Sequence, residues 1–164
     1  MTIRIMTIDD YDAVYALWDS LPGIGLHEYE DSLEGMAYYL RRNPESCFVA
    51  EEEGAACGAP HNHPGAARHP STEGNCRIIG AVLCGNDGRR GYINHLAVAQ
   101  EYQGRGLGRA LVSKCLEVMR KEGIPMCSLV TFRSNEAGNA FWDAIGSTRH
   151  ESLLYRKLET GIQS

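Results

Sequence analysis

The sequence has no apolar run that approaches the ~20 residues needed to cross a membrane. Its first residues, Met1–Arg4, do not resemble the start of a signal peptide. We therefore expect a cytoplasmic protein with no membrane partner. Positive charge is also scarce, since 16 Lys and Arg residues stand against 21 Asp and Glu, for a net charge of −5 at pH 7. This balance lacks the basic footprint of a nucleic-acid-binding domain, so we expect no nucleic-acid partner.

The six cysteines lie in a sequence without an expected export signal, so we predict free thiols rather than disulfides. Cys84, Cys115 and Cys127 fall inside apolar strand or helix patterns and are interpreted as core residues. The 164 residues, 43% of them hydrophobic, are enough for one domain with a sizeable core. We predict a single domain over 1–164 with a short C-terminal tail at 159–164.

The first part of the chain predicts a strand over Thr2–Ile8 and then two helices. Thr7 or Asp9 would cap the first helix, and Asp31-Ser32 would begin the second, which ends at Asn43-Pro44. The apolar faces are predicted to be Tyr11, Val14, Tyr15, Trp18 and Leu21, and then Leu33, Met36, Ala37 and Leu40. The acidic and aromatic stretch 27–31 between the helices fits either a solvated junction or a rim that attracts an amine.

Residues Cys47–Ala50 and Arg77–Cys84 predict an antiparallel pair of strands with a long segment between them. That segment, 54–76, is rich in Gly, Pro, Ala and His and has no periodicity, so we predict a flexible hairpin insertion. It contains potential zinc ligands, namely Cys57, His61, His63, His69 and Cys76. Their spacing matches no familiar zinc motif, so no metal site is predicted.

The most informative stretch is a predicted strand over Tyr92–Val98, a glycine-rich turn over Gln103–Arg109 and a helix that follows it. The apolar positions of this helix are Leu107, Ala110, Leu111, Cys115, Val118 and Met119. Glycines allow a ligand to approach the backbone, and the first helical turn presents unpaired N–H groups at the positive end of the helix dipole. The pattern therefore predicts a site for a phosphate. It matches neither a nucleotide P-loop nor a dinucleotide fingerprint.

Beyond this helix, the sequence predicts a strand over Met126–Phe132, a helix capped by Ser134 or Asn135, and a last strand over Leu153–Leu158. The inward face of the last helix is predicted to be Ala137, Ala140, Phe141, Ala144 and Ile145. Strands and helices thus alternate, which indicates an α/β chain built on a mixed sheet.

Two motifs resemble those of the GNAT superfamily of acyl-CoA-dependent N-acetyltransferases. Gln103-x-x-Gly106-x-Gly108, after the strand that ends in Leu96-Ala97-Val98, is similar to the pyrophosphate loop of that family. Asn135, followed by Ala140, Phe141, Trp142 and Gly146, is similar to its second signature. The two motifs cover about Gly91 to Gly146. The resemblance implies a GNAT-like central mixed β-sheet flanked by helices on both faces.

The resemblance also implies an N-acetyltransferase that uses acetyl-CoA as co-substrate. A primary amine would attack the thioester directly in a ternary complex, with no covalent enzyme intermediate. Main-chain groups of 96–98 would run beside the pantetheine, those of 104–109 would hold the pyrophosphate, and Asn135 would meet the CoA arm. The implied cofactor-binding residues are Leu96, Ala97, Val98, Gln103, Gly104, Arg105, Gly106, Leu107, Gly108, Arg109, Asn135 and Trp142.

The sequence departs from the family at the positions of the acid and the base. Trp142 stands where members of the family often carry a Tyr that protonates the thiolate, and Val130 where some carry a Glu. Tyr92 and His95 are then the candidate catalytic residues, with Tyr155 a further titratable group. The period of two along a strand predicts that His95 points away from Tyr92 and Asn94.

The same departures motivate an alternative function, a catalytically impaired CoA-binding module that acts in sensing or partner binding. The sequence does not identify the amine acceptor, and it leaves a homodimer open.

Overall fold

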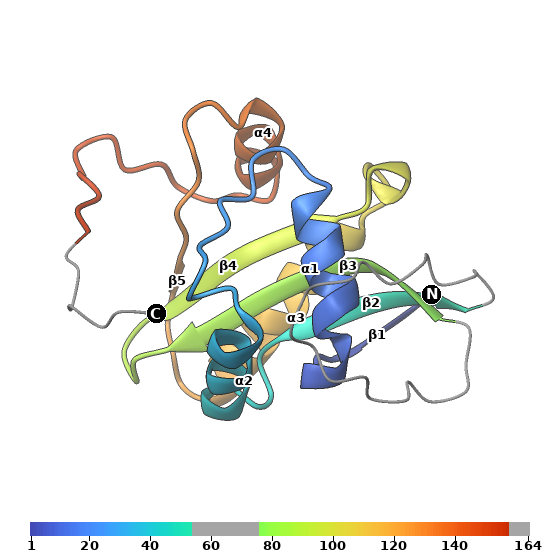
Figure 1. Cartoon of the computed structure of the whole chain (residues 1–164). Coiled ribbons are helices and arrows are strands. Elements are labelled where there is room, and N and C mark those ends of the chain that lie inside the picture. The colour runs from blue at the N-terminus through green and yellow to red at the C-terminus, as the bar shows by residue number, and fades with distance from the viewer. Residues whose placement is uncertain (54–75, 158–164) are drawn as a thin grey trace. The chain divides into compact units, whose positions relative to one another are not determined.

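The computed structural model describes residues 1–53 and 76–157 of the chain. The chain divides into two compact units, Met1–Val130 and Thr131–Ser164. In the first unit, five strands form one sheet in the order β1-β2-β3-β4-β5 (Figure 1). The strands are β1 (Thr2–Ile5), β2 (Phe48–Glu53), β3 (Cys76–Asn86), β4 (Gly91–Val98) and β5 (Cys127–Ser128).

The sheet is mixed, as predicted. Each of the first four strands pairs antiparallel with its neighbour, and β5 pairs parallel to β4. β2 and β3 pair as far as Glu53 opposite Cys76, the two residues that flank the connection 54–75. The connection itself lies outside the described residues. The predictions that it is a flexible insertion and that it holds no metal site therefore stay predictions.

Helices cover both faces of the sheet in this unit, again as predicted (Figure 1). They are α1 (Tyr11–Asp19), α2 (Leu33–Arg42) and α3 (Leu107–Lys121). The two glycines of β3 define the faces, because residues five apart on a strand point to opposite sides. A Cβ at Gly80 would meet Leu111 and Leu107 of α3, and one at Gly85 would meet Tyr39 of α2 and Asn43 just beyond it. α2 therefore covers one face and α3 the other.

The structure corrects several predicted boundaries near the N-terminus. β1 ends at Ile5, three residues earlier than predicted, because the backbone N–H of Thr7 donates to the carboxylate of Asp10 and begins a 3-10 turn there. Ser32 caps α2 as predicted, with its hydroxyl accepting the N–H of Gly35 at 3.1 Å. On α2 only Met36 is buried, and Leu33, which was expected to face inward, is 43% exposed. α1 ends at Asp19, before Leu21.

The core between the sheet and α3 is apolar and follows the predicted helix face. The buried residues of α3 are Leu107, Leu111, Val112, Cys115 and Met119. Each such aliphatic side chain contributes about 1.5–3 kcal/mol when it leaves water. Free thiols are found at Cys47, Cys84, Cys115 and Cys127, and burial raises the pKa of Cys47 to about 12. The interpretation of Cys84, Cys115 and Cys127 as core residues holds for the first two, while Cys127 is half-buried.

The chain after α3 contains less strand than predicted. Gly123 follows the end of α3 with a φ of 75°. β5 pairs with β4 over only two residues, and Val130 is 70% exposed. In the second unit, α4 (Glu136–Ala144) begins at Asn135 as predicted, although none of its residues is buried. The described part of the expected last strand, 153–157, is not a strand. No helix of the described residues has the length and apolar character of a membrane span.

Candidate active site

The glycine-rich turn lies between the end of β4 and the start of α3. Gly104 and Gly106 have φ values of 72° and 83°, a left-handed conformation that side chains with a Cβ adopt only with strain. Gly106 is the N-cap of α3 and offers no side chain to the first helical N–H groups, and no acidic residue lies in that turn. A Cβ placed on either glycine would meet no atom within 4 Å. The result is an open helix N-terminus that suits an anion.

Two contacts shape the entrance to this turn. The side chain of Gln103 donates through Nε2 to the carbonyl oxygen of Val98 at 3.0 Å, which ties the turn back to the end of β4. The guanidinium of Arg105 lies over the ring of Tyr102, with 5.4 Å between Cζ and the ring centroid. The turn is therefore held in place by its own neighbours, and the backbone N–H groups from Gly104 onward can face a ligand.

The end of β4 next to this turn has one side without a strand partner. β5 pairs with β4 only at Gly91 and Tyr92, whereas β3 pairs with β4 as far as Val98. Among the described strands, none pairs with residues 96–98 on the β5 side. A strand edge of this kind presents backbone N–H and C=O groups to whatever lies beside it. The first unit thus brings the anion-binding turn and an open strand edge together within one stretch of chain.

β4 contains a β-bulge at His95. Ala97 pairs with Ala81 and Asn94 with Leu83, so His95 and Leu96 both face the single residue Val82 of β3. The backbone of His95 has a φ of 48°, the one positive value at a residue other than glycine in the part of the chain that the structure describes. A bulge adds a residue to one strand only, so it interrupts the alternation of side chains along β4.

The bulge overturns the prediction that His95 points away from Asn94. The His95 ring packs edge-on against Trp18 of α1, with 4.8 Å between centroids and 74° between planes. Asn94 contacts Tyr39 of α2, which lies on the same face of the sheet as α1 (Figure 1). Both side chains therefore lie on the face that α1 and α2 cover.

His95 also meets a buried carboxylate. Its Nε2 lies 2.9 Å from Oδ1 of Asp31, and the side chains of His95 and Asp31 are 20% and 5% exposed. Nε2 of His95 is buried and has no aligned hydrogen-bond partner among the described residues. No sequence pattern links these two residues, because Asp31 by itself fits a helix start or an acidic rim.

Asp31 is ionised in this environment. Burial opposes its charge, but the contact with His95 and the backbone N–H of His27, which donates to Oδ2 at 2.7 Å, outweigh burial and lower the pKa of Asp31. Asp31 is buried, whereas its neighbours Glu28, Tyr29 and Glu30 in the 27–31 stretch are exposed.

Tyr92, the other candidate, lies at the opposite end of β4 and has other partners. Its side chain is 42% exposed, and its hydroxyl lies 3.5 Å from Oδ2 of Asp87 in the β3–β4 turn. Tyr92 and Leu96 are four positions apart, a distance of about 13 Å along a strand. The structure therefore surrounds His95 and Tyr92 with different side chains.

The two remaining predicted site residues, Asn135 and Trp142, belong to the second unit. Oδ1 of Asn135 accepts the backbone N–H of Gly138 at 2.9 Å and so caps α4. Trp142 packs edge-on against Phe141, with 5.1 Å between ring centroids. The first contact explains why Asn135 opens this helix, and Trp142 is half-buried on it.

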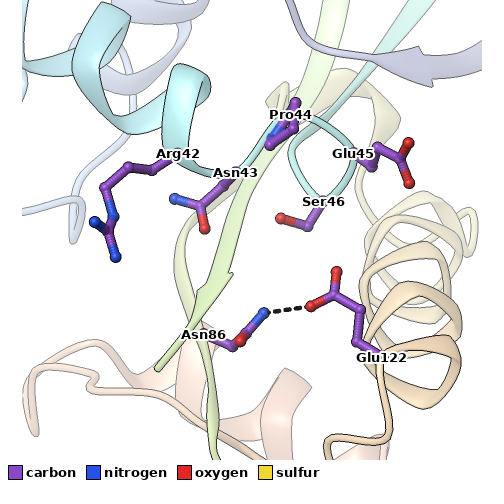
Figure 2. A pocket seen from close by; sticks show the side chains of 7 residues that line it. All are labelled: Arg42, Asn43, Pro44, Glu45, Ser46, Asn86 and Glu122. Atoms are coloured by element: carbon purple, nitrogen blue, oxygen red, sulfur yellow. Dashed lines mark hydrogen bonds between the residues drawn. The ribbon is translucent and has the colours of Figure 1, made fainter. Parts of the chain in front are cut away.

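A polar cavity of about 250 Å³ lies at the other end of α3 (Figure 2). It is lined by Arg42, Asn43, Pro44, Glu45, Ser46, Asn86 and Glu122. The side chains of Asn86 and Glu122 hydrogen-bond to each other at 2.7 Å. Because α3 has 15 residues, its two ends are about 22 Å apart. The cavity is therefore separate from the turn, the open edge and His95.

Comparison with known proteins matches the sequence profile of the acetyltransferase (GNAT) family to residues 11–146. An acetyltransferase of Yersinia pestis is 26% identical over 157 residues, which cover 96% of this chain and 94% of that protein. N-alpha-acetyltransferase 30 of Schizosaccharomyces pombe is 38% identical over 95 residues, 55% of this chain and 63% of that protein. A chain of the NatC complex bound to Gag peptide and CoA superimposes with a TM-score of 0.66 at 22% identity, covering 92% of this chain and 86% of that chain.

Proposed function

Because the chain belongs to the acetyltransferase (GNAT) family, we propose that it transfers an acetyl group from acetyl-CoA to a primary amine. The amine attacks the thioester directly in a ternary complex. The observation that carries this proposal is the open N-terminus of α3 next to the unpaired edge of β4 at 96–98. Acetyl-CoA would fit both parts, since it has a pyrophosphate for the helix and amide groups along its pantetheine for the strand edge.

The cofactor-binding residues in this proposal are those that the resemblance implies. Backbone N–H groups from Gly104 to Arg109 hold the pyrophosphate, and the main chain of 96–98 lies beside the pantetheine and the thioester. His95 directly precedes that segment, so its ring is a candidate to accept the proton of the amine, and Tyr92 is a second candidate. Asn135 and Trp142 would contact the CoA arm and its thioester end. The reaction is proposed to take place in the cytoplasm.

The acceptor is a primary amine whose identity stays open. The name of the Schizosaccharomyces pombe relative suggests that peptides with a free N-terminus belong in the first assays. Amino acids, small amines and aminoglycoside-type antibiotics complete the panel. Release of CoA thiol with one acceptor and not with the others would identify the class.

The test of cofactor binding uses two glycines that have the same backbone conformation. Gly106 has a φ of 83° and Gly88, in the β3–β4 turn, a φ of 85°, and a Cβ on either would meet no atom within 4 Å. Gly106→Asp and Gly88→Asp therefore introduce similar backbone strain, but only the first adds an anion where the pyrophosphate would bind. We expect acetyl-CoA to raise the Tm of the natural protein and of Gly88→Asp, and not that of Gly106→Asp.

Equal shifts of Tm in all three proteins would exclude the helix N-terminus as the cofactor site. Turnover decides between the two functions that the sequence leaves open. A protein that gains stability from acetyl-CoA but releases no CoA thiol with any amine would be the binding module rather than the enzyme.

A further inference from the structure

We propose that Asp31 is a positioning residue for His95, holding the ring at the β4 bulge and stabilising the positive charge that His95 gains when it accepts the proton of the amine. The inference rests on the proposed acetyl transfer and adds to it a residue from a different part of the chain. It follows from four observations on the first unit: the bulge, the buried carboxylate, the packed indole and the charges nearby.

The bulge gives His95 its place. A side chain with a Cβ is strained at positive φ relative to ordinary strand backbone. His95 adopts this conformation with a φ of 48°, and as a result its ring lies against α1 rather than in the core below α3. Strain of this kind persists only where surrounding contacts stabilise it, and the contacts here are with Trp18 and Asp31.

Asp31 is held on three sides. Its Oδ2 accepts the N–H of His27 at 2.7 Å, its backbone oxygen accepts the hydroxyl of Tyr11 at 3.0 Å, and its Oδ1 lies 2.9 Å from His95. A carboxylate that is 5% exposed needs a compensating charge or donor nearby. His95 would supply that charge when its ring takes up a proton.

Trp18 sets the plane of the ring. It is 1% exposed and makes an edge-on contact with the His95 ring, so it leaves little freedom for rotation. Nε2 of His95 is fully covered while the whole side chain is 20% exposed, so the exposed surface belongs to its other atoms. With Nε2 facing Asp31, Nδ1 is the nitrogen left to take a proton.

Among the described residues, the titratable groups that contact Asp31 or Asn94 come from three segments. Tyr11 comes from α1, His27 from the loop before α2, and Tyr39 from α2, where it contacts Asn94. Burial raises the pKa of Tyr11 and of Tyr39, so both phenols are neutral near pH 7. Asp31 is therefore the one carboxylate among these neighbours that faces His95.

The proton balance of the step is simple. The ammonium group of the acceptor gives one proton to Nδ1 of His95, and the free amine attacks the carbonyl carbon of the thioester. The C–N bond forms as the C–S bond breaks, the departing thiolate takes the second amine proton, and the imidazolium returns its proton to solvent. Asp31 exchanges no proton and acts only through His95.

Two variants separate this role from loss of a buried carboxylate in general. Asp31→Asn removes the charge beside His95, whereas Asp10→Asn removes the charge of the other buried aspartate, which pairs with Arg4 at 2.7 Å. The readout is NMR of the ¹⁵N-labelled histidine rings against pH, which needs no turnover. We expect neutral His95 to carry its proton on Nε2, and its titration midpoint to fall by about one pH unit or more in Asp31→Asn. In Asp10→Asn and in the conservative variant Asp31→Glu, the midpoint should stay near that of the natural protein.

Kinetics gives the second readout. In Asp31→Asn, kcat should fall about tenfold or more, the acid limb of the kcat/KM profile should move to lower pH, and the stabilisation by acetyl-CoA should persist. An unchanged midpoint or an unchanged pH profile in Asp31→Asn would overturn the inference. If that variant does not fold, an Nδ1-protonated tautomer in the natural protein would overturn it as well. Absence of turnover in the natural protein, with the NMR shift present, would instead count against the proposed acetyl transfer.

Discussion

At the scale of single residues, Asp10 and Asp31 show how similar surroundings lead to different roles. Both are buried, and each accepts a backbone N–H. For both, burial opposes ionisation, but hydrogen bonds and a nearby cationic side chain outweigh it and lower the pKa. Asp10 faces Arg4, which is always charged, so its contact is structural. Asp31 faces a histidine, a side chain that can accept and release a proton, so its contact can take part in proton transfer.

At the residue scale, substitutions of Trp142 test the assignment of the catalytic acid. Its ring packs edge-on against Phe141 at 5.1 Å, a contact that a phenyl ring at 142 can keep. Indole cannot deliver a proton near neutral pH, whereas a phenol could. We therefore expect Trp142→Phe to keep most turnover and Trp142→Ala mainly to weaken acetyl-CoA binding, as measured by steady-state kinetics and by titration with acetyl-CoA.

Phe141→Ala is the matched control, since it removes the same ring pair from the other side and leaves position 142 unchanged. It should bind acetyl-CoA better than Trp142→Ala does. A rise in turnover of more than tenfold in Trp142→Tyr, about 1.4 kcal/mol of barrier, would show that this position is a missing acid. The impaired binding module would then become the better description of the protein.

At the scale of elements, the two helix starts at Ser32 and Asn135 are built alike. Each cap side chain accepts the N–H of the glycine three residues later, Gly35 in α2 and Gly138 in α4. The neighbours of the two glycines differ. A Cβ at Gly35 would lie 2.4 Å from the backbone oxygen of Tyr29, whereas one at Gly138 would meet only the side chain of Asn135, at 2.6 Å. A side chain can move aside more easily than a backbone carbonyl.

This difference predicts whether alanine in place of each glycine raises or lowers the free energy of unfolding. Alanine is favoured over glycine in a helix by about 1 kcal/mol, so helix propensity alone would make Gly35→Ala stabilising. The clash with the Tyr29 carbonyl should reverse that sign and destabilise the protein by roughly 1–3 kcal/mol. Gly138→Ala, the matched variant, should change the free energy of unfolding less. Urea unfolding followed by circular dichroism compares the two, and a Gly35→Ala protein as stable as the natural one would contradict the geometry.

At the scale of the whole molecule, the connection between β2 and β3 offers a test of what the sheet requires. Glu53 and Cys76 lie opposite each other at the ends of the two strands, so a short hairpin turn can join them. We expect replacement of 54–75 by a two-residue Asn-Gly turn to preserve the fold and the affinity for acetyl-CoA, because the anion-binding turn and the β4 edge lie elsewhere in the sheet order. Loop closure should become slightly more favourable.

The measurements are thermal unfolding and acetyl-CoA titration of the shortened chain beside the natural one. Zinc analysis of the natural protein belongs with them. Stoichiometric zinc that is lost in Cys57→Ala and His61→Ala would contradict the prediction that 54–76 holds no metal. Loss of acetyl-CoA binding in a shortened chain that still folds would show that the segment contributes to the site.

The amino-acid sequence by itself determined the features that depend on short stretches of chain. Gly104 and Gly106 adopt positive φ where the glycine spacing predicts a turn, and the apolar period after them forms α3 with its buried face. Ser32 and Asn135 cap helices where the local pattern places a start. Such signals involve neighbours within about one helical turn, so the cap, the turn and the period can be recognised without knowing the rest of the fold.

Only the tertiary structure decided the surroundings of His95. The period of two predicted the wrong face, because a bulge exists only relative to the partner strand, and its register depends on how β3 and β4 pair. The contact with Asp31 joins a loop to a strand that lies far along the chain, and no local pattern encodes it. The length of β5 also depends on a long-range interaction. The apolar residues of 126–132 predict a longer strand, but pairing with β4 limits it to Cys127–Ser128. Strand pairing and charge compensation are long-range interactions, and they complete the site that the glycine motif begins.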